Sequence, residues 1–204
     1  MHITFGRKSR LTALGAGLIT AAAVAVSASG PALADTADTG GTAAISTPRA
    51  IVVGLAKSTI IMLPGNPASS SYAKGADTVT LPVTGGNGEV GNFFGTVNFG
   101  GRLIIINSKA GKTVTITSLK LNFFTGALTG VLPGGTTQTA LAYTGGNMSA
   151  SSDPGPPATE TFSCDELHLS GKAAKALNTD LNTTVFIRGT NIGAFTTTFD
   201  VTVS

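Results

Sequence analysis

Residues 113–123 read TVTITSLKLNF, and the alternation of polar and apolar side chains along this stretch indicates the fold class. The apolar residues Val114 and Ile116 share one face of an extended chain, with threonines on the other face. The alternation changes phase at Ser118, because the next apolar residues start at Leu119. We therefore predict a strand with a bulge or bend at Ser118, in an antiparallel sheet that buries one face.

The same short-period pattern recurs toward the C-terminal end. The 170 residues after position 34 contain 28 Thr and 23 Gly, a composition that favours short strands and tight turns. Further strands are predicted at 50–53, 58–63, 78–83, 95–99, 102–107, 127–132, 139–143, 160–163, 183–188 and 194–203.

One segment has helical spacing instead. Ser170 is a suitable N-cap residue, and an apolar stripe follows at Ala173, Ala174, Leu177 and Leu181. We predict an all-β protein, an antiparallel β-sandwich or open barrel with one short helix near the C-terminus.

The N-terminal region predicts export. Three basic residues precede the uncharged, mostly apolar stretch 11–27, and Ala32-Leu33-Ala34 is a small-x-small cleavage site. We therefore expect a secretory signal peptide at 1–34, a flexible lead-in at 35–49 and a single β-rich domain at 50–204. The expected location is secreted, extracellular or cell-wall associated, with no membrane span after signal cleavage.

The charge balance argues against nucleic acid as a partner. The whole chain has 13 Lys and Arg against 10 Asp and Glu, but three of the basic residues lie in the predicted signal. The remaining chain has ten of each sign, whereas a phosphate-binding surface needs a clustered excess of Lys and Arg.

Catalytic side chains are scarce. His168 is the only histidine after position 34, so any Ser-His-Asp triad must use it, and no G-x-S-x-G nucleophile motif is present. The ten carboxylates are scattered and suggest no acid–base pair. We therefore predict a non-enzymatic protein, with a hydrolase using His168 as the alternative.

The densest group of metal-ligand residues is Cys164, Glu166 and His168, which would share one face of a regular strand. The span from Cys164 to His168 would be about 13 Å, too long for one tetrahedral ion. We expect no metal site. Cys164 is the single cysteine and is interpreted as a small buried hydrophobe, with a reactive thiol or an intermolecular disulfide as alternatives.

The order of features from Ser58 onward resembles the HtaA-type domain of small secreted actinobacterial proteins. The segments that carry the resemblance are TVTLPVTGG (78–86), GTVNFGGRL (95–103), ALTGV (127–131), LSGKAAKALN (169–178) and FIRGTNIG (186–193), together with 113–123. The resemblance implies an all-β cell-surface or secreted module, and some members bind haem. The haem ligands are not matched, because residues 98–101 contain no histidine and the chain has no Trp.

These observations predict a secreted, non-enzymatic module with a binding or structural role at the cell surface and an unknown extracellular ligand. Oligomerisation is compatible with the sequence. We expect no cofactor; the alternative is a haem or other small-ligand binding protein of the HtaA-like type. The candidate ligand-binding residues are His168, Tyr143 and Tyr72.

Overall fold

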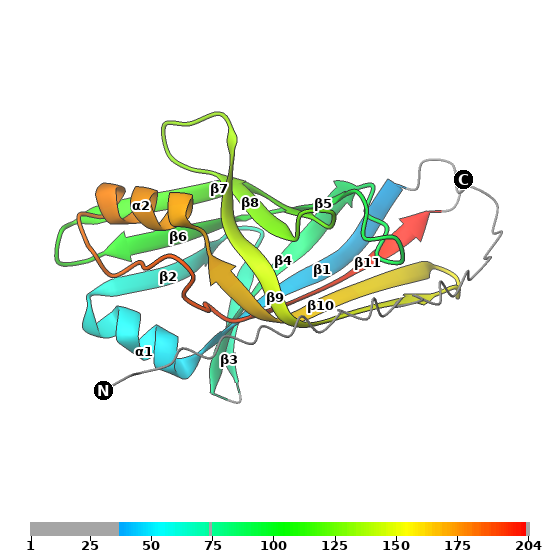
Figure 1. Ribbon diagram of the computed structural model, residues 1–204, viewed down its shortest axis with the longest axis horizontal. Coiled ribbons are helices and arrows are strands. Elements are labelled where there is room, and N and C mark those ends of the chain that lie inside the picture. Colours follow the sequence, from blue (N-terminus) through cyan, green and yellow to red (C-terminus); the bar gives the residue numbers. More distant parts are fainter. Residues whose placement is uncertain (1–36, 74, 203–204) are drawn as a thin grey trace, which may run out of the picture. The chain divides into compact units, whose positions relative to one another are not determined.

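The computed structural model describes residues 37–73 and 75–202 and is built mainly of antiparallel strands (Figure 1). In chain order the elements are β1 (Ala37–Pro48), α1 (Arg49–Lys57), β2 (Ile60–Gly65), β3 (Ser69–Ala73), β4 (Ala76–Gly86), β5 (Thr96–Phe99), β6 (Arg102–Asn107), β7 (Lys112–Asn122), β8 (Ala127–Val131), β9 (Gln138–Asp153), β10 (Ala158–Leu169), α2 (Gly171–Asp180) and β11 (Ala194–Thr202).

Eight of the strands close into a barrel. The hydrogen-bonded neighbours run β7-β5-β4-β1-β11-β10-β9-β8, and β8 pairs back onto β7. Closure provides hydrogen-bond partners for the backbone N–H and C=O groups that would be unpaired at the edges of an open sheet. The predicted all-β class is therefore correct, and the barrel is closed rather than open. Strand β6 pairs with β7 and carries β2, while β3 pairs with β4.

Strand β7 is bent at the predicted place. Its first half, up to Ile116, pairs with β6, and its second half, from Leu119, pairs with β5. Ser118 lies between the halves with a positive φ of 52°, and the register with β8 shifts between Thr117 and Lys120. The prediction of an irregularity at Ser118 is confirmed. The irregularity separates the half of β7 that pairs with β6 from the half that pairs with β5.

The predicted flexible lead-in is wrong where the structure describes it. Residues 37–48 form β1, which pairs with β11 on one side and β4 on the other. Of the side chains described in this small, polar segment, Ala43 and Ile45 belong to the hydrophobic core. Backbone pairing on both edges therefore makes residues 37–48 a strand. Pairing with segments distant in sequence does not require the alternation of polar and apolar side chains from which strands were predicted.

The strand predicted at 50–53 is also wrong, and the described residues form two helices rather than one. Helix α1 begins directly after Pro48. Proline suits a helix start because it fixes φ and lacks an N–H that would need a partner. The β-branched residues of this segment suggested a strand, but Ile51 and Leu55 are spaced four apart and share one helical side.

Helix α2 begins at the predicted cap. The Ser170 hydroxyl accepts a hydrogen bond from the Ala173 N–H at 3.0 Å. The helix lies beside β9 and β7 (Figure 1) and buries Ala173, Ala174 and Leu177. The strand predicted at 183–188 is instead irregular chain.

The predicted signal peptide lies outside the described residues and stays a prediction. In the part of the chain that the structure describes, no helix is long and apolar enough to cross a membrane.

Candidate ligand-binding site

Two of the three candidate ligand residues lie side by side. Tyr143 on β9 pairs directly with His168 on β10 in the antiparallel register. Directly opposed side chains in such a ladder have Cβ atoms about 4.5–5.5 Å apart. Both face outward: Tyr143 is exposed, and the His168 side chain is 38% exposed.

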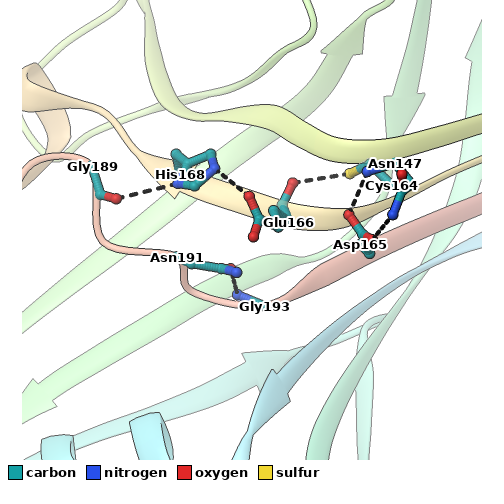
Figure 2. A network of polar contacts seen from close by, with 8 residues as sticks. All are labelled: Asn147, Cys164, Asp165, Glu166, His168, Gly189, Asn191 and Gly193. Atoms are coloured by element: carbon teal, nitrogen blue, oxygen red, sulfur yellow. Dashed lines mark hydrogen bonds and ion pairs between the residues drawn. The ribbon is translucent and has the colours of Figure 1, made fainter.

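The imidazole of His168 is held from two sides (Figure 2). Its Nδ1 lies 3.2 Å from the Gly189 carbonyl oxygen, and its Nε2 lies 2.8 Å from Glu166 Oε2. Both partners are hydrogen-bond acceptors, so a doubly protonated ring satisfies both, whereas a neutral ring donates to only one.

Gly145 fixes the third side of the ring. A Cβ at this position would lie 2.8 Å from His168 Cδ2 and 2.9 Å from Nε2, so the imidazole lies against the bare backbone of β9. Opposite β9, the irregular segment 189–193 pairs with the end of β10, and His168 forms an isolated bridge with Asn191. His168 therefore lies between two backbone segments in a fixed orientation.

The expected common face of Cys164, Glu166 and His168 does not exist. The ladder between β9 and β10 is irregular between Cys164 and Glu166. Before this point Cys164 faces the core, whereas after it Leu167 faces the core and Glu166 and His168 face outward. The described residues contain no group of three or more His, Cys, Asp or Glu arranged to hold a metal ion. The bulge explains this correction, because it reverses the alternation of the strand.

Cys164 is free and only 3% exposed. Its Sγ lies 3.2 Å from the Glu166 carbonyl oxygen, and burial raises the pKa of the thiol. A thiol in this position cannot reach a second chain without local opening. The structure therefore supports the buried hydrophobe and argues against the intermolecular disulfide.

Tyr143 and His168 line an open cavity of about 700 Å³. Its walls come from residues 137–140, the end of β10, the start of α2 and the turn at 188–189. Two cations, Lys172 and Arg188, also line it. Neither cation was predicted from the sequence, since nothing local distinguishes Lys172 and Arg188 from the other basic residues.

Tyr72 is not part of this site. It lies on β3, is 59% exposed and pairs with Asp77 of β4. It is absent from the lining of the cavity at Tyr143. Of the three candidates, the structure brings together Tyr143 and His168.

The fold and the site together define a β-barrel with an open, partly cationic cavity on its outer surface. No protein-family model matches the sequence, and no curated protein matches it significantly. Two of the solved structures that are similar in fold come from Corynebacterium glutamicum. The C-terminal domain of HtaA matches with a TM-score of 0.59 at 10% identity, over 82% of this chain and 99% of that one. The heme-binding protein HtaB matches with a TM-score of 0.51 at 14% identity, over 83% of this chain and 96% of that one. The resemblance to the HtaA-type domain is thus supported by the fold.

The comparison corrects the expectation of no cofactor. That expectation depended on the missing histidine and tryptophan at the matched positions. HtaB, whose fold is similar, is a heme-binding protein, so the expectation of no cofactor no longer stands.

The side chains at the cavity fit haem chemically. Tyrosine and histidine are both known axial ligands of haem iron. Lys172 and Arg188 match the two carboxylates of haem, and arginine pairs with carboxylates in a bidentate geometry. The volume of about 700 Å³ is in the usual range for ligand sites, about 300–1,000 Å³.

Proposed function

We propose that this protein is a secreted, non-enzymatic haem-binding module whose site is the cavity at Tyr143 and His168. The observation that carries the proposal is the pairing of these two side chains in a cavity that also holds Lys172 and Arg188. Secretion is supported by the predicted signal at 1–34. The similarity in fold to HtaB supports haem as the ligand.

Tyr143 is the side chain we assign to the iron. The His168 Nε2 atom is already engaged by Glu166 at 2.8 Å, and its Nδ1 atom faces Gly189. Binding iron through His168 would break one of these contacts, whereas the exposed phenol of Tyr143 is on the open face of the same ladder. When haem is bound, Tyr143 would hold the iron, His168 would position the Tyr143 side chain, and Lys172 and Arg188 would pair with the haem carboxylates.

The alternative of a hydrolase using His168 has less support. A serine hydrolase needs a hydroxyl within hydrogen-bond reach of the imidazole. The ring nitrogens of His168 instead face a carboxylate and a carbonyl. The nearby Ser170 hydroxyl donates to the Ala140 carbonyl and caps α2, so it serves the fold.

The test is a haem titration of the purified protein, followed by absorbance in the Soret region. We expect a saturable band. Tyr143→Phe removes the proposed ligand atom and keeps the ring, so it should lower the affinity at least tenfold and shift the band. Tyr72→Phe makes the same change outside the cavity and should leave the titration unchanged.

The His168→Ala variant separates the two roles. We expect weaker binding with the band at its original wavelength, because His168 positions rather than binds. If His168→Ala abolishes the band and Tyr143→Phe keeps it, His168 is the axial ligand and our assignment of Tyr143 is wrong. The haem function itself fails if the unmodified protein gives no saturable Soret band.

A further inference from the structure

The apolar side of α1 faces a void. Ile51 and Leu55 lie four residues apart and so share one side of this helix, yet none of its residues is buried. Both side chains line a second cavity, distinct from the one at Tyr143. A helix of a globular protein normally packs its apolar stripe against the core. Here Leu55 contacts the core, but Ile51 and Leu55 both stay only half-buried.

The second cavity is small and apolar. Its volume is about 130 Å³, close to the ~150 Å³ of an engineered apolar cavity that stays dry and takes up benzene. It lies between α1, α2, the sheet and the segment 185–192, and Thr190 has the only polar side chain among its lining residues. A water molecule needs two to four polar partners, which this lining does not supply.

The cavity opens onto exposed aliphatic side chains. Leu63 is 44% exposed and Ile187 is 66% exposed, and both belong to the lining. A compact ring seated in the cavity would leave these two side chains in water. An extended chain would cover them while its end filled the interior.

We propose that this cavity binds the end of an unbranched hydrocarbon chain, as in an acyl or alkyl group, whose outer methylenes lie on Leu63 and Ile187. Among the described residues the lining contains no charged side chain, so a polar head group stays outside. The inference does not rest on the proposed haem function, because the two cavities share only Leu169 among the residues that the structure describes.

Calorimetric titration of the full chain with 1-alkanols of increasing length, and with benzene, tests the proposal. Burial of one methylene contributes about 0.8 kcal/mol, so we expect the affinity to rise about fourfold per carbon. The rise should stop once the chain outgrows the cavity and its mouth. Benzene should bind more weakly than octanol. An absence of alkanol binding, or benzene binding more tightly than octanol, would overturn the proposal.

Three variants locate the binding site. Ala173 is fully buried and lines the cavity, so Ala173→Leu should fill it and lower octanol affinity at least tenfold. Ile187→Ser changes an exposed residue, so it should fold even if Ala173→Leu does not. It should weaken octanol binding several-fold and butanol binding little. Ala50→Leu adds the same side chain at an exposed position of α1 and should change nothing.

The same variants separate this proposal from the haem site. Tyr143→Phe should leave octanol binding unchanged, and Ala173→Leu should leave the Soret titration unchanged once circular dichroism has shown that α2 is intact. If neither Ala173→Leu nor Ile187→Ser changes octanol binding, the alkanol binds elsewhere and the cavity is not its site.

Discussion

The two ends of the barrel are filled differently. One end, here called the aromatic end, contains Phe93, Phe123, Phe162 and Phe199. Phe162 meets Phe123 at a centroid distance of 5.3 Å and Phe93 at 6.3 Å, both nearly edge to face. The other end, here called the aliphatic end, lies under α1, α2 and the segment 185–192 and contains the small apolar cavity.

One buried and one half-buried carboxylate also distinguish the aromatic end. The Gly88 N–H donates to Asp38 at 2.8 Å, and the Val90 N–H donates to Glu160 at 2.8 Å. These bonds fix the loop between β4 and β5. The two cavities instead border α2 and the segment 185–192, so the cavities and the loop fixed by these carboxylates belong to different parts of the barrel.

The largest expected effect is on packing. Phe162→Ala at the aromatic end should lower the free energy of unfolding by about 3–5 kcal/mol, because Phe162 is 2% exposed and loses two ring contacts. Phe186→Ala, which removes the same ring beside the cavity, should cost less than half as much. Denaturant unfolding of both variants measures the difference. Equal losses would contradict the contrast between the two ends.

The next effect is the pH dependence of the aromatic end. Burial raises the pKa of Asp38 to about 6 from 3.8, and the Glu160 charge adds to the rise. A raised carboxyl pKa means that the native state holds the proton longer than the unfolded state. The contribution of the Asp38 carboxyl to the free energy of unfolding is therefore most favourable below about pH 4, and it is lost as the pH rises through 6.

Asp38→Asn should remove this dependence. Relative to the unmodified protein, the free energy of unfolding of the variant should rise by up to roughly 3 kcal/mol between pH 4 and pH 7. Thermal unfolding across this range measures it, with Asp200→Asn as the control. A difference between variant and parent that stays constant with pH would show that Asp38 does not titrate in this window.

A smaller effect is expected at the haem site. Gly145→Ala places a Cβ within 3 Å of the His168 ring, including its Nε2 atom, so the imidazole must shift and its contact with Glu166 should change. We expect about a tenfold loss of haem affinity with little change in stability. Gly91→Ala, where no atom lies within 4 Å of the added Cβ, is the control. Unchanged haem binding in Gly145→Ala would show that the position of His168 is unimportant.

The smallest effect concerns the cap of α2. Ser170→Ala removes the acceptor for the Ala173 N–H and the donor to the Ala140 carbonyl. A loss of about 1 kcal/mol is expected in denaturant unfolding. Ser151→Ala, on the exposed part of β9, should be neutral. A neutral Ser170→Ala would mean that packing alone holds the helix.

Local patterns predicted the features that depend on local physics. The period-two segments became strands of the barrel, the change of phase at Ser118 became a bend, and Ser170 became a helix cap. Two of the wrong predictions, a flexible lead-in at 35–49 and a strand at 50–53, failed because contacts with distant parts of the chain outweighed the local pattern. β1 is a strand because β4 and β11 pair with it, and α1 is a helix although its β-branched residues favour extended chain.

The candidate site could be predicted only in part. Tyr143 and His168 stood out because tyrosine and histidine are rare in this chain, so composition alone marked them. Their pairing depends on a register between strands 25 residues apart in sequence, and Lys172 and Arg188 join them only after α2 and the turn at 188–189 fold back. Contrary to the prediction, Cys164 does not share a face with Glu166 and His168, because a bulge between Cys164 and Glu166 reverses the alternation of the strand.

The sequence by itself therefore determined the all-β class, an expectation of export and a short set of possible ligand residues. These follow from side-chain alternation, from an apolar N-terminal stretch and from which residue types are present. The tertiary structure alone decided that the barrel closes, that β1 belongs to it, and which outward-facing side chains share a cavity. Those outcomes depend on strand register and on contacts between distant segments, and neither is encoded within one stretch of sequence.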